Sequence, residues 1–155
     1  MCGIIGIVGN KPVAERLVDG LRRMEYRGYD SAGVCTIHEG ALVRRRAEGK
    51  LNNLIAELAD NPAPGEIGIA HTRWATHGAP TAKNAHPHAT EHVALVHNGI
   101  IENFKELRAE LRDAGRTLES DTDSEVVAHL VSELVENGRS PQEAVADVLP
   151  RLRGA

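Results

Sequence analysis

The feature that most constrains this chain is an apolar run that begins at the amino terminus. Residues 2–8, CGIIGIV, are suited to a buried strand, and Cys2 opens it. If the initiator methionine is trimmed, Cys2 carries a thiol and a free α-amine on one residue. A terminal amine is weakly basic near neutral pH, so it can take the thiol proton and activate the cysteine as a nucleophile. The alternative is that Cys2 is a small buried hydrophobe, the usual position of a free cysteine.

The composition is that of one globular domain with a core. The 155 residues include 18 basic and 22 acidic side chains in no long block of one sign, so we expect no nucleic-acid partner. No segment approaches the roughly 20 apolar residues that span a bilayer, and no secretory signal opens the chain. We therefore expect a cytoplasmic protein without a membrane partner, in which Cys2 and Cys35 stay unpaired and Cys35 is in the core.

The first half of the chain alternates strand-like and helix-like segments. Asn10 is suited to cap a helix that ends near Arg27-Gly28. One face of that helix would carry Val13, Leu17, Leu21 and Met24. Residues 32–38 and 41–47 flank Glu39-Gly40, a pattern that predicts a β-hairpin.

The second half continues this mixture. A helix is expected over 51–58, short strands over 67–70 and 93–96, and an apolar helical stripe from 104 to 111. Two further helices would begin at capping boxes, Thr122 with Glu125 and Ser140 with Glu143. The polar stretch between the two strands is long enough to be either functional or disordered. Together these elements predict an α+β or layered α/β fold, with which a four-layer sandwich agrees.

Three loop segments contain the residue types that acyl transfer requires. In HTRWATHG (71–78), Arg73 offers a planar cation suited to a carboxylate, and Trp74 could exclude water or simply anchor the loop. In HNGIIEN (97–103), Asn98 and Gly99 offer two N–H donors for an oxyanion, although Asn-Gly is also the commonest hairpin turn, and that is the simpler interpretation.

The third segment is SDTDSEV (120–126). Asp121 and Asp123 could be carboxylates at a helix N-terminus, or one of them could hold a substrate ammonium. Histidines are frequent between residues 71 and 97, but their spacing does not reproduce a zinc site, and we expect no metal.

Six motifs in one order are more specific than any of them alone. They are CGI at the amino terminus, RRMEYRGYDSAG (22–33), HTRWATHG, NAHPH (84–88), HNGIIEN and SDTDSEV. This set resembles the glutaminase domain of the glucosamine-6-phosphate synthases, which are class II glutamine amidotransferases of the N-terminal nucleophile hydrolase group. The resemblance covers residues 2–155 and implies an αββα four-layer sandwich. It also implies that the C-terminal part of the domain and the sugar-isomerase domains are missing.

The resemblance implies an enzyme that hydrolyses the side-chain amide of L-glutamine through a Cys2 thioester, without a cofactor. Asn98 and Gly99 match the oxyanion hole, Arg73 the residue that holds the glutamine α-carboxylate, and Asp123 the partner of its α-ammonium. The remaining matches are Thr76 and His77 in the glutamine pocket, Trp74 at the ammonia gate and Arg27 near the nucleophile.

In this family the ammonia is delivered to fructose 6-phosphate, which is bound by the synthase half. One alternative is the glutaminase domain of a phosphoribosylpyrophosphate amidotransferase, which shares the cysteine and the asparagine-glycine pair. The other is a truncated, non-catalytic fragment or binding module. Strand edges left open by the missing part would favour association, and a homo-oligomer remains an open alternative.

Overall fold

The centre of the molecule is a four-stranded antiparallel sheet with the strand order β1-β4-β2-β3. A computed structural model describes residues 2–75 and 77–154, without the Arg27 side chain. The strands are β1 (Gly3–Val8), β2 (Ser31–His38), β3 (Ala41–Glu48) and β4 (Ile67–Arg73). The predicted hairpin is confirmed: Glu39 and Gly40, which join β2 to β3, have φ angles of 50° and 79°, the positive values that a two-residue hairpin turn requires.

The strand register determines where the amino terminus lies. Gly3 on β1 is opposite Thr72 on β4, and Ser31 on β2 is opposite Arg73. β4 continues three residues beyond the predicted end at Ala70. The start of β1, which directly follows Cys2, therefore lies beside the carboxyl end of β4.

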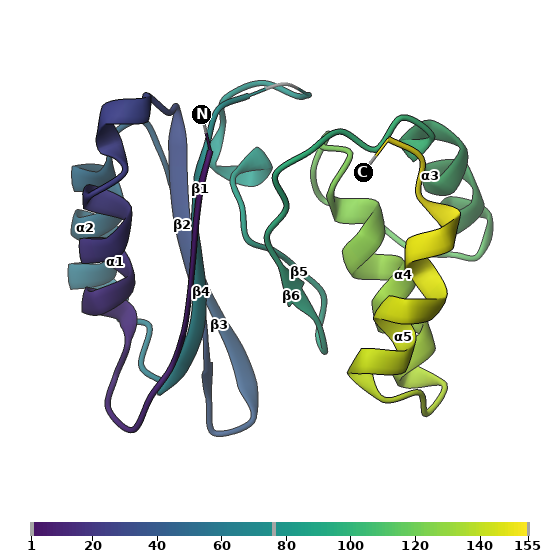
Figure 1. The fold of residues 1–155 in the computed structure, drawn as a ribbon, viewed down its shortest axis with the longest axis horizontal. Helices are drawn as coiled ribbons and strands as arrows, with labels where there is room; N and C mark the ends of the chain where they lie inside the picture. The colour runs from purple at the N-terminus through teal and green to yellow at the C-terminus, as the bar shows by residue number, and fades with distance from the viewer. Residues whose placement is uncertain (1, 76, 155) are drawn as a thin grey trace.

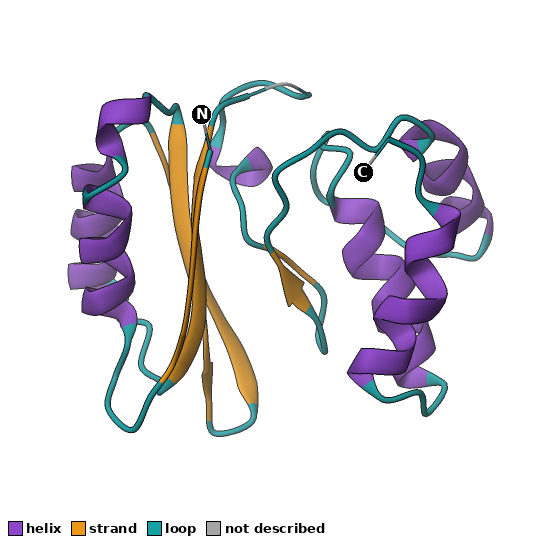
Figure 2. Ribbon diagram, in the orientation of Figure 1, coloured by secondary structure: helices purple, strands orange, loops and turns teal. Residues whose placement is uncertain are grey.

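Two helices, α1 (Ala14–Arg22) and α2 (Leu51–Asp60), cover one face of this sheet (Figures 1 and 2). The core between them and the sheet is fully buried and includes Leu17, Leu21, Val34, Leu54 and Ala70. The predicted apolar face of the first helix is confirmed for Leu17 and Leu21. The predicted cap at Asn10 and the predicted end near Arg27-Gly28 are wrong, because α1 ends at Arg22. The backbone N–H of Val13 donates to Gly65 O at 2.9 Å, which holds this connection against the start of β4, and the helix begins one residue later.

β1 is an edge strand, and the expectation that it is buried is correct for only one of its faces. Ile4 and Val8 are 42% and 82% exposed, although Ile5 and Ile7 pack against the α1–α2 core. Only one face of β1 is covered by helices. Because side chains alternate across a strand, every second residue points away from that core.

The other face of the sheet is opposite a small hairpin and a second group of helices (Figure 1). The hairpin consists of β5 (His88–Ala89) and β6 (Ala94–Leu95), shorter than the strand predicted over 93–96. The helices are α3 (Phe104–Asp113), α4 (Glu125–Glu136) and α5 (Pro141–Val148), and the 3₁₀ turns are η1 (Glu25–Arg27), η2 (Ala82–Asn84) and η3 (Leu149–Arg151). A second core joins the helices and includes Ile101, Leu111, Val126, Leu130 and Val148. The layer order is α, β, β, α, as predicted.

The two predicted capping boxes have different outcomes. At α5, Ser140 accepts from the backbone N–H of Glu143, and the Glu143 carboxylate accepts from the N–H of Ser140, which confirms the prediction. At α4 the N-cap residue is Ser124, and the Thr122 hydroxyl bonds His88 Nε2 at 2.9 Å instead. A partner from a distant segment has replaced the local cap.

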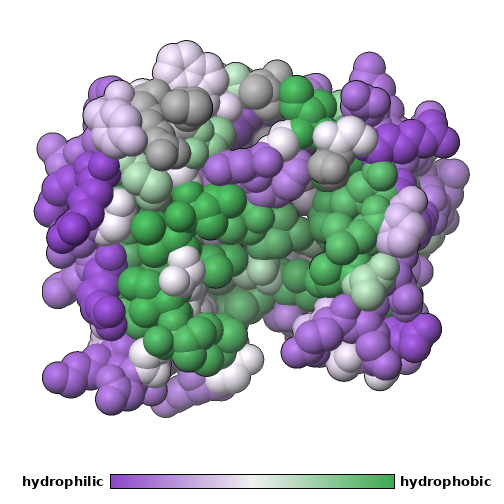
Figure 3. Space-filling model, viewed as in Figure 1, coloured by the Kyte–Doolittle hydropathy of each residue, from purple (hydrophilic) through white to green (hydrophobic). Residues whose placement is uncertain are grey.

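An apolar groove of about 700 Å³ separates the sheet from α4 and α5. Figure 3 shows hydrophobic surface gathered in this hollow. Its walls include Ile37, Ile67 and Ile69 from the sheet and Val131 and Val145 from the helices. Among the described residues, no helix combines the length and the hydrophobicity that crossing a bilayer requires.

Candidate active site

A pocket of about 320 Å³ lies where β1 begins and β4 ends. The predicted site residues that line it are Cys2, Arg73, Trp74, His77, Asn98, Gly99 and Asp123. They come from four separate segments, which only the fold brings together. Thr76 and the Arg27 side chain lie outside the described part of the chain, so their predicted roles stay predictions.

Cys2 is held at the pocket by backbone contacts. Its Sγ accepts a hydrogen bond from the N–H of Trp74 at 3.2 Å, and its carbonyl oxygen accepts from Asn98 Nδ2 at 3.4 Å. The next residue is closely surrounded: a Cβ on Gly3 would lie 2.8 Å from Met24 Cε and 2.9 Å from Thr72 Oγ1, so a larger residue would require these side chains to move. The strand therefore carries the thiol to the pocket through a tightly packed glycine.

Arg73 provides a buried cation at the end of β4. Its guanidinium donates to the carbonyl oxygens of His77, Gly78 and Ala79, which form the loop around it. Burial lowers the pKa of Arg73. The Asp30 carboxylate, 3.9 Å away, opposes that shift. A guanidinium stays charged in either case. The loop of residues 77–79 is thus held around a permanent positive charge.

Asp30 is a site residue that sequence reasoning missed. Its Oδ2 accepts from the backbone N–H of Ala75, and its own N–H donates to Arg73 O at 2.8 Å. The available signal was its place in the motif at 22–33. The same motif also contacts Trp74, whose indole ring packs on Gly28. A Cβ at this position would lie only 2.7 Å from the ring, and the φ of 71° also favours glycine. Trp74 is 54% exposed at the pocket mouth.

Asn98 and Gly99 are not a hairpin turn, so the simpler interpretation of this dipeptide is wrong. The segment runs from β6 to α3, and the β5–β6 hairpin turns earlier in the chain. Asn98 Oδ1 lies 2.7 Å from His71 Nε2, which leaves the Asn98 amide nitrogen directed to Cys2. A Cβ on Gly99 would lie 2.6 Å from His97 Nε2, so no larger residue fits there without rearrangement.

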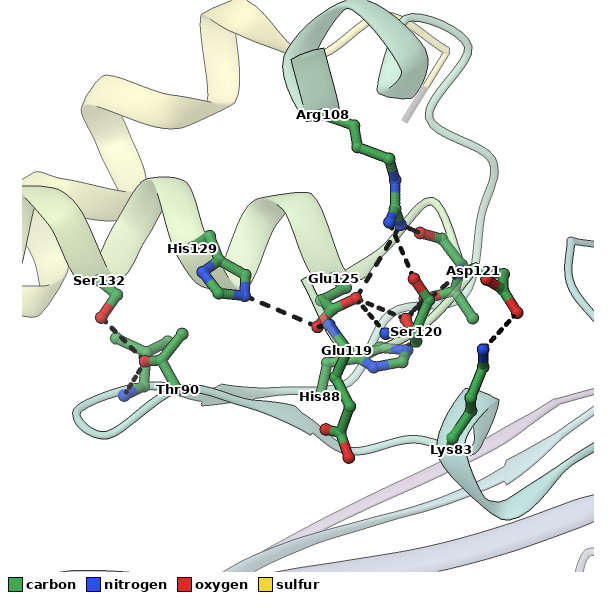
Figure 4. A network of polar contacts seen from close by, with 12 residues as sticks. Lys83, His88, Thr90, Arg108, Glu119, Ser120, Asp121, Glu125, His129 and Ser132 are labelled. Carbon is green, nitrogen blue, oxygen red and sulfur yellow. Dashed lines mark hydrogen bonds and ion pairs between the residues drawn. The ribbon is translucent and has the colours of Figure 1, made fainter. Parts of the chain in front are cut away.

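The structure distinguishes the two candidate aspartates. Asp123 is 4% exposed, lines the pocket and accepts from the N–H of Ile101 at 2.9 Å. Asp121 instead forms an exposed ion pair with Lys83 Nζ at 3.0 Å (Figure 4). Of the two aspartates, Asp123 is therefore the one that lines the pocket.

A buried polar network fixes the segment that carries Asp123 (Figure 4). The carboxylate of Glu125, the first residue of α4, accepts from the N–H groups of Glu119 and Ser120 at 2.7 Å each. Arg108 on α3 donates to the carbonyl oxygens of Ser120 and Thr122. Backbone donors and acceptors that a loop would otherwise show to water are thus satisfied within the protein.

Asn84 in the NAHPH motif ties this segment to the Arg73 loop. Its Nδ2 donates to Ala79 O at 3.0 Å, and its Oδ1 accepts from the N–H of Asp121 at 2.9 Å. The NAHPH motif does not by itself indicate this role for Asn84. Its position makes the two sides of the pocket one connected unit.

Three buried histidines form a column, and two of them, His71 and His86, line the pocket. The rings of His71 and His86 stack at a centroid distance of 4.2 Å, and His86 meets His88 edge-on at 4.4 Å. Burial lowers the pKa of His71 to about 4 and of His88 to about 3, so the rings are neutral at pH 7. Among the residues that the structure describes, no group of three or more His, Cys, Asp or Glu side chains is arranged for a metal ion.

Comparison with known proteins agrees with this geometry. The sequence pattern of the glutamine amidotransferase domain family matches residues 59–142. Two curated relatives, the glutamine–fructose-6-phosphate aminotransferases (isomerizing) of Zymomonas mobilis and Brucella suis, are 66% and 65% identical to the chain along its whole length. The chain spans 26% of the length of each.

A solved structure shares the fold. The glutamine phosphoribosylpyrophosphate amidotransferase of B. subtilis, complexed with ADP and GMP, is 25% identical, with a TM-score of 0.81. That match covers the whole of this chain and 34% of the B. subtilis chain. The αββα layers, the pocket at the start of β1 and the matched sequence pattern lead to one conclusion: this chain belongs to the glutamine amidotransferase domain family.

Proposed function

We propose that residues 2–155 form a glutaminase domain that hydrolyses the side-chain amide of L-glutamine. The observation that carries the proposal is the convergence of Cys2, Asn98, Arg73 and Asp123 on one pocket of about 320 Å³. A thiol, an amide donor, a cation and an anion are the groups that bind an amino acid and attack its amide.

In this mechanism the α-amine of Cys2, free once Met1 is removed, takes the thiol proton. The thiolate attacks the amide carbon of glutamine, and the Asn98 side-chain N–H and the Gly99 backbone N–H stabilise the oxyanion. The carbon–nitrogen bond then breaks, and ammonia leaves with the proton held by the amine. Water hydrolyses the resulting thioester to glutamate and restores the thiol.

The pocket also provides for recognition of the amino acid. In this proposal Arg73 binds the α-carboxylate and Asp123 the α-ammonium, which is supported by the buried charge of the required sign at each position. His77, whose ring meets Phe104 edge-on at 5.2 Å, and Trp74 form the wall near the opening. Because one protein charge binds the α-carboxylate and the other binds the α-ammonium, the pocket selects a free amino acid over a residue within a peptide.

The ammonia acceptor is proposed to be fructose 6-phosphate, bound elsewhere in a longer polypeptide. This is supported by the names of relatives that are 63–66% identical, whereas the phosphoribosylpyrophosphate enzyme is 25% identical. A cytoplasmic location is proposed with it, since free thiols such as those of Cys2 and Cys35 are typical of a reducing compartment.

The function is tested by labelling with 6-diazo-5-oxo-norleucine, a glutamine-shaped electrophile, followed by intact mass measurement. The wild-type chain should lose Met1 and gain one adduct on Cys2, and Cys2→Ala should gain none and release no ammonia from glutamine. Cys35→Ser is the matched control and should keep the adduct, because Cys35 is 2% exposed and burial raises the pKa of its thiol to about 11. An unlabelled wild type, or labelled Cys2→Ala, would support the non-catalytic alternative.

A further inference from the structure

One contact of the proposed oxyanion donor has no role in the mechanism above. His71 lies on β4 and is fully buried, and its Nε2 is 2.7 Å from Asn98 Oδ1. β4 is bordered by β1 and β2, where Ile4 and Gly33 are the register partners of His71. Asn98, by contrast, is exposed in an irregular segment. The imidazole is therefore the anchored partner of this pair.

The chemistry of the two groups determines the direction of the hydrogen bond. A carboxamide oxygen only accepts, so Nε2 of His71 carries the ring proton. The Cys2 carbonyl oxygen, on the other side of the amide, can also only accept, so it must face the amide nitrogen. Asn98 then has one favourable orientation, with Oδ1 toward His71 and Nδ2 toward the Cys2 carbonyl oxygen, 3.4 Å away.

The histidine column keeps the His71 ring in place and neutral. Its ring stacks on His86 at an interplanar angle of 22°, and His86 Nδ1 accepts from the N–H of His97 at 3.4 Å. His86 in turn meets His88, whose Nε2 bonds the Thr122 hydroxyl. Each ring is therefore fixed by a neighbour. A neutral donor also orients the amide without adding a positive charge beside the thiol.

We propose that His71 is a positioning residue that holds the Asn98 carboxamide with its N–H donors turned toward the reacting carbonyl. The role rests on the proposed glutamine hydrolysis and deepens it. Without the bond from His71, the amide can flip and present Oδ1, which repels a developing oxyanion instead of stabilising it. His71 thus acts on the transition state through Asn98.

The test compares two substitutions in the full-length protein that carries this chain. His71→Leu removes the donor and keeps an apolar side chain of similar reach. It should lower kcat for glutamine hydrolysis roughly 10–100-fold. This loss does not exceed that expected for removing an oxyanion donor outright, which is about 100–1,000-fold. KM should change less than about threefold, because substrate charges are bound elsewhere. His71→Gln places an N–H near the position of Nε2 and should recover most of kcat.

A double-mutant cycle separates positioning from general damage. If His71 acts only through Asn98, then Asn98→Ala and the double variant His71→Leu/Asn98→Ala have the same kcat. Alkylation of Cys2 by iodoacetamide forms no oxyanion and should proceed at the wild-type rate in His71→Leu. Losses that add in the double variant, slower alkylation, or an unchanged kcat in His71→Leu would each overturn the role.

Two further outcomes remain decisive. If His71→Leu does not fold, His71→Gln is compared with His71→Asn, whose shorter amide does not reach the position of Nε2. Equal kcat values for these two variants overturn the proposal, and a higher kcat for His71→Gln supports it. A wild-type protein that hydrolyses no glutamine refutes the proposed function itself. An active wild type with an unaffected His71→Leu variant refutes only the positioning role.

Discussion

At the scale of single residues, Asp123 offers a separate test of substrate recognition. Asp123→Asn keeps the size of the side chain and an oxygen for the Ile101 N–H, but removes the negative charge. Losing one partner of a buried charge pair costs about 2 kcal/mol or more, so KM for glutamine should rise about 30-fold. We expect kcat to change little, because the ammonium is bound equally in the ground and transition states. Steady-state assays of ammonia release measure both constants.

The matched control is Asp121→Asn, two residues away. Asp121 pairs with Lys83 at the surface, where an ion pair contributes little, so KM should stay within about twofold of wild type. A similar rise in KM for both variants would contradict the assignment of the ammonium site to Asp123.

At the scale of elements, the start of α4 depends on one buried carboxylate. Burial alone would raise the pKa of Glu125, but hydrogen bonds from His129, from Ser120 and from the backbone of Glu119 outweigh it and lower the pKa to about 2. A carboxylate with a lowered pKa stabilises the fold above its unfolded pKa near 4.5, and this contribution is lost as the pH falls toward 2. Glu125→Gln should therefore lower the free energy of unfolding by about 2–3 kcal/mol at pH 7, and by much less near pH 2.

Urea denaturation at several pH values measures this difference. Glu143→Gln is the control, because Glu143 also caps a helix but is exposed. Its effect on stability should be clearly smaller. A Glu125→Gln variant whose stability loss is the same at pH 7 and pH 3 would show that the charge of Glu125 is not responsible.

At the scale of the whole molecule, the apolar groove dominates the surface that residues 1–155 expose on their own. Ile37, Ile67, Val145 and Leu149 are 43–58% exposed along or beside it. Contiguous apolar surface of this kind promotes association. We expect residues 1–155 alone to bind the dye ANS and to self-associate with increasing concentration in sedimentation velocity. Val145→Lys with Leu149→Lys should reduce both effects, and an unchanged dye signal would show that the groove is not the binding surface.

The sequence by itself determined most of the local elements and named the candidate residues of the site. Periodicity located the hairpin, the helices and the apolar face of α1, because each follows from side chains three or four residues apart or alternating along a strand. The ordered motifs likewise named Cys2, Arg73, Asn98 and Asp123.

Only the tertiary structure decided which of these residues meet. It paired Thr122 with His88, joined His71 to Asn98, and connected Asn84 to the backbone of Asp121. His71 and Asn98 are 27 residues apart in the sequence, and His88 and Thr122 are 34 apart, so no local pattern encodes either pair. Their choice depends on which buried donors and acceptors face each other once the layers pack, because a buried polar group must find its partner wherever the fold supplies one.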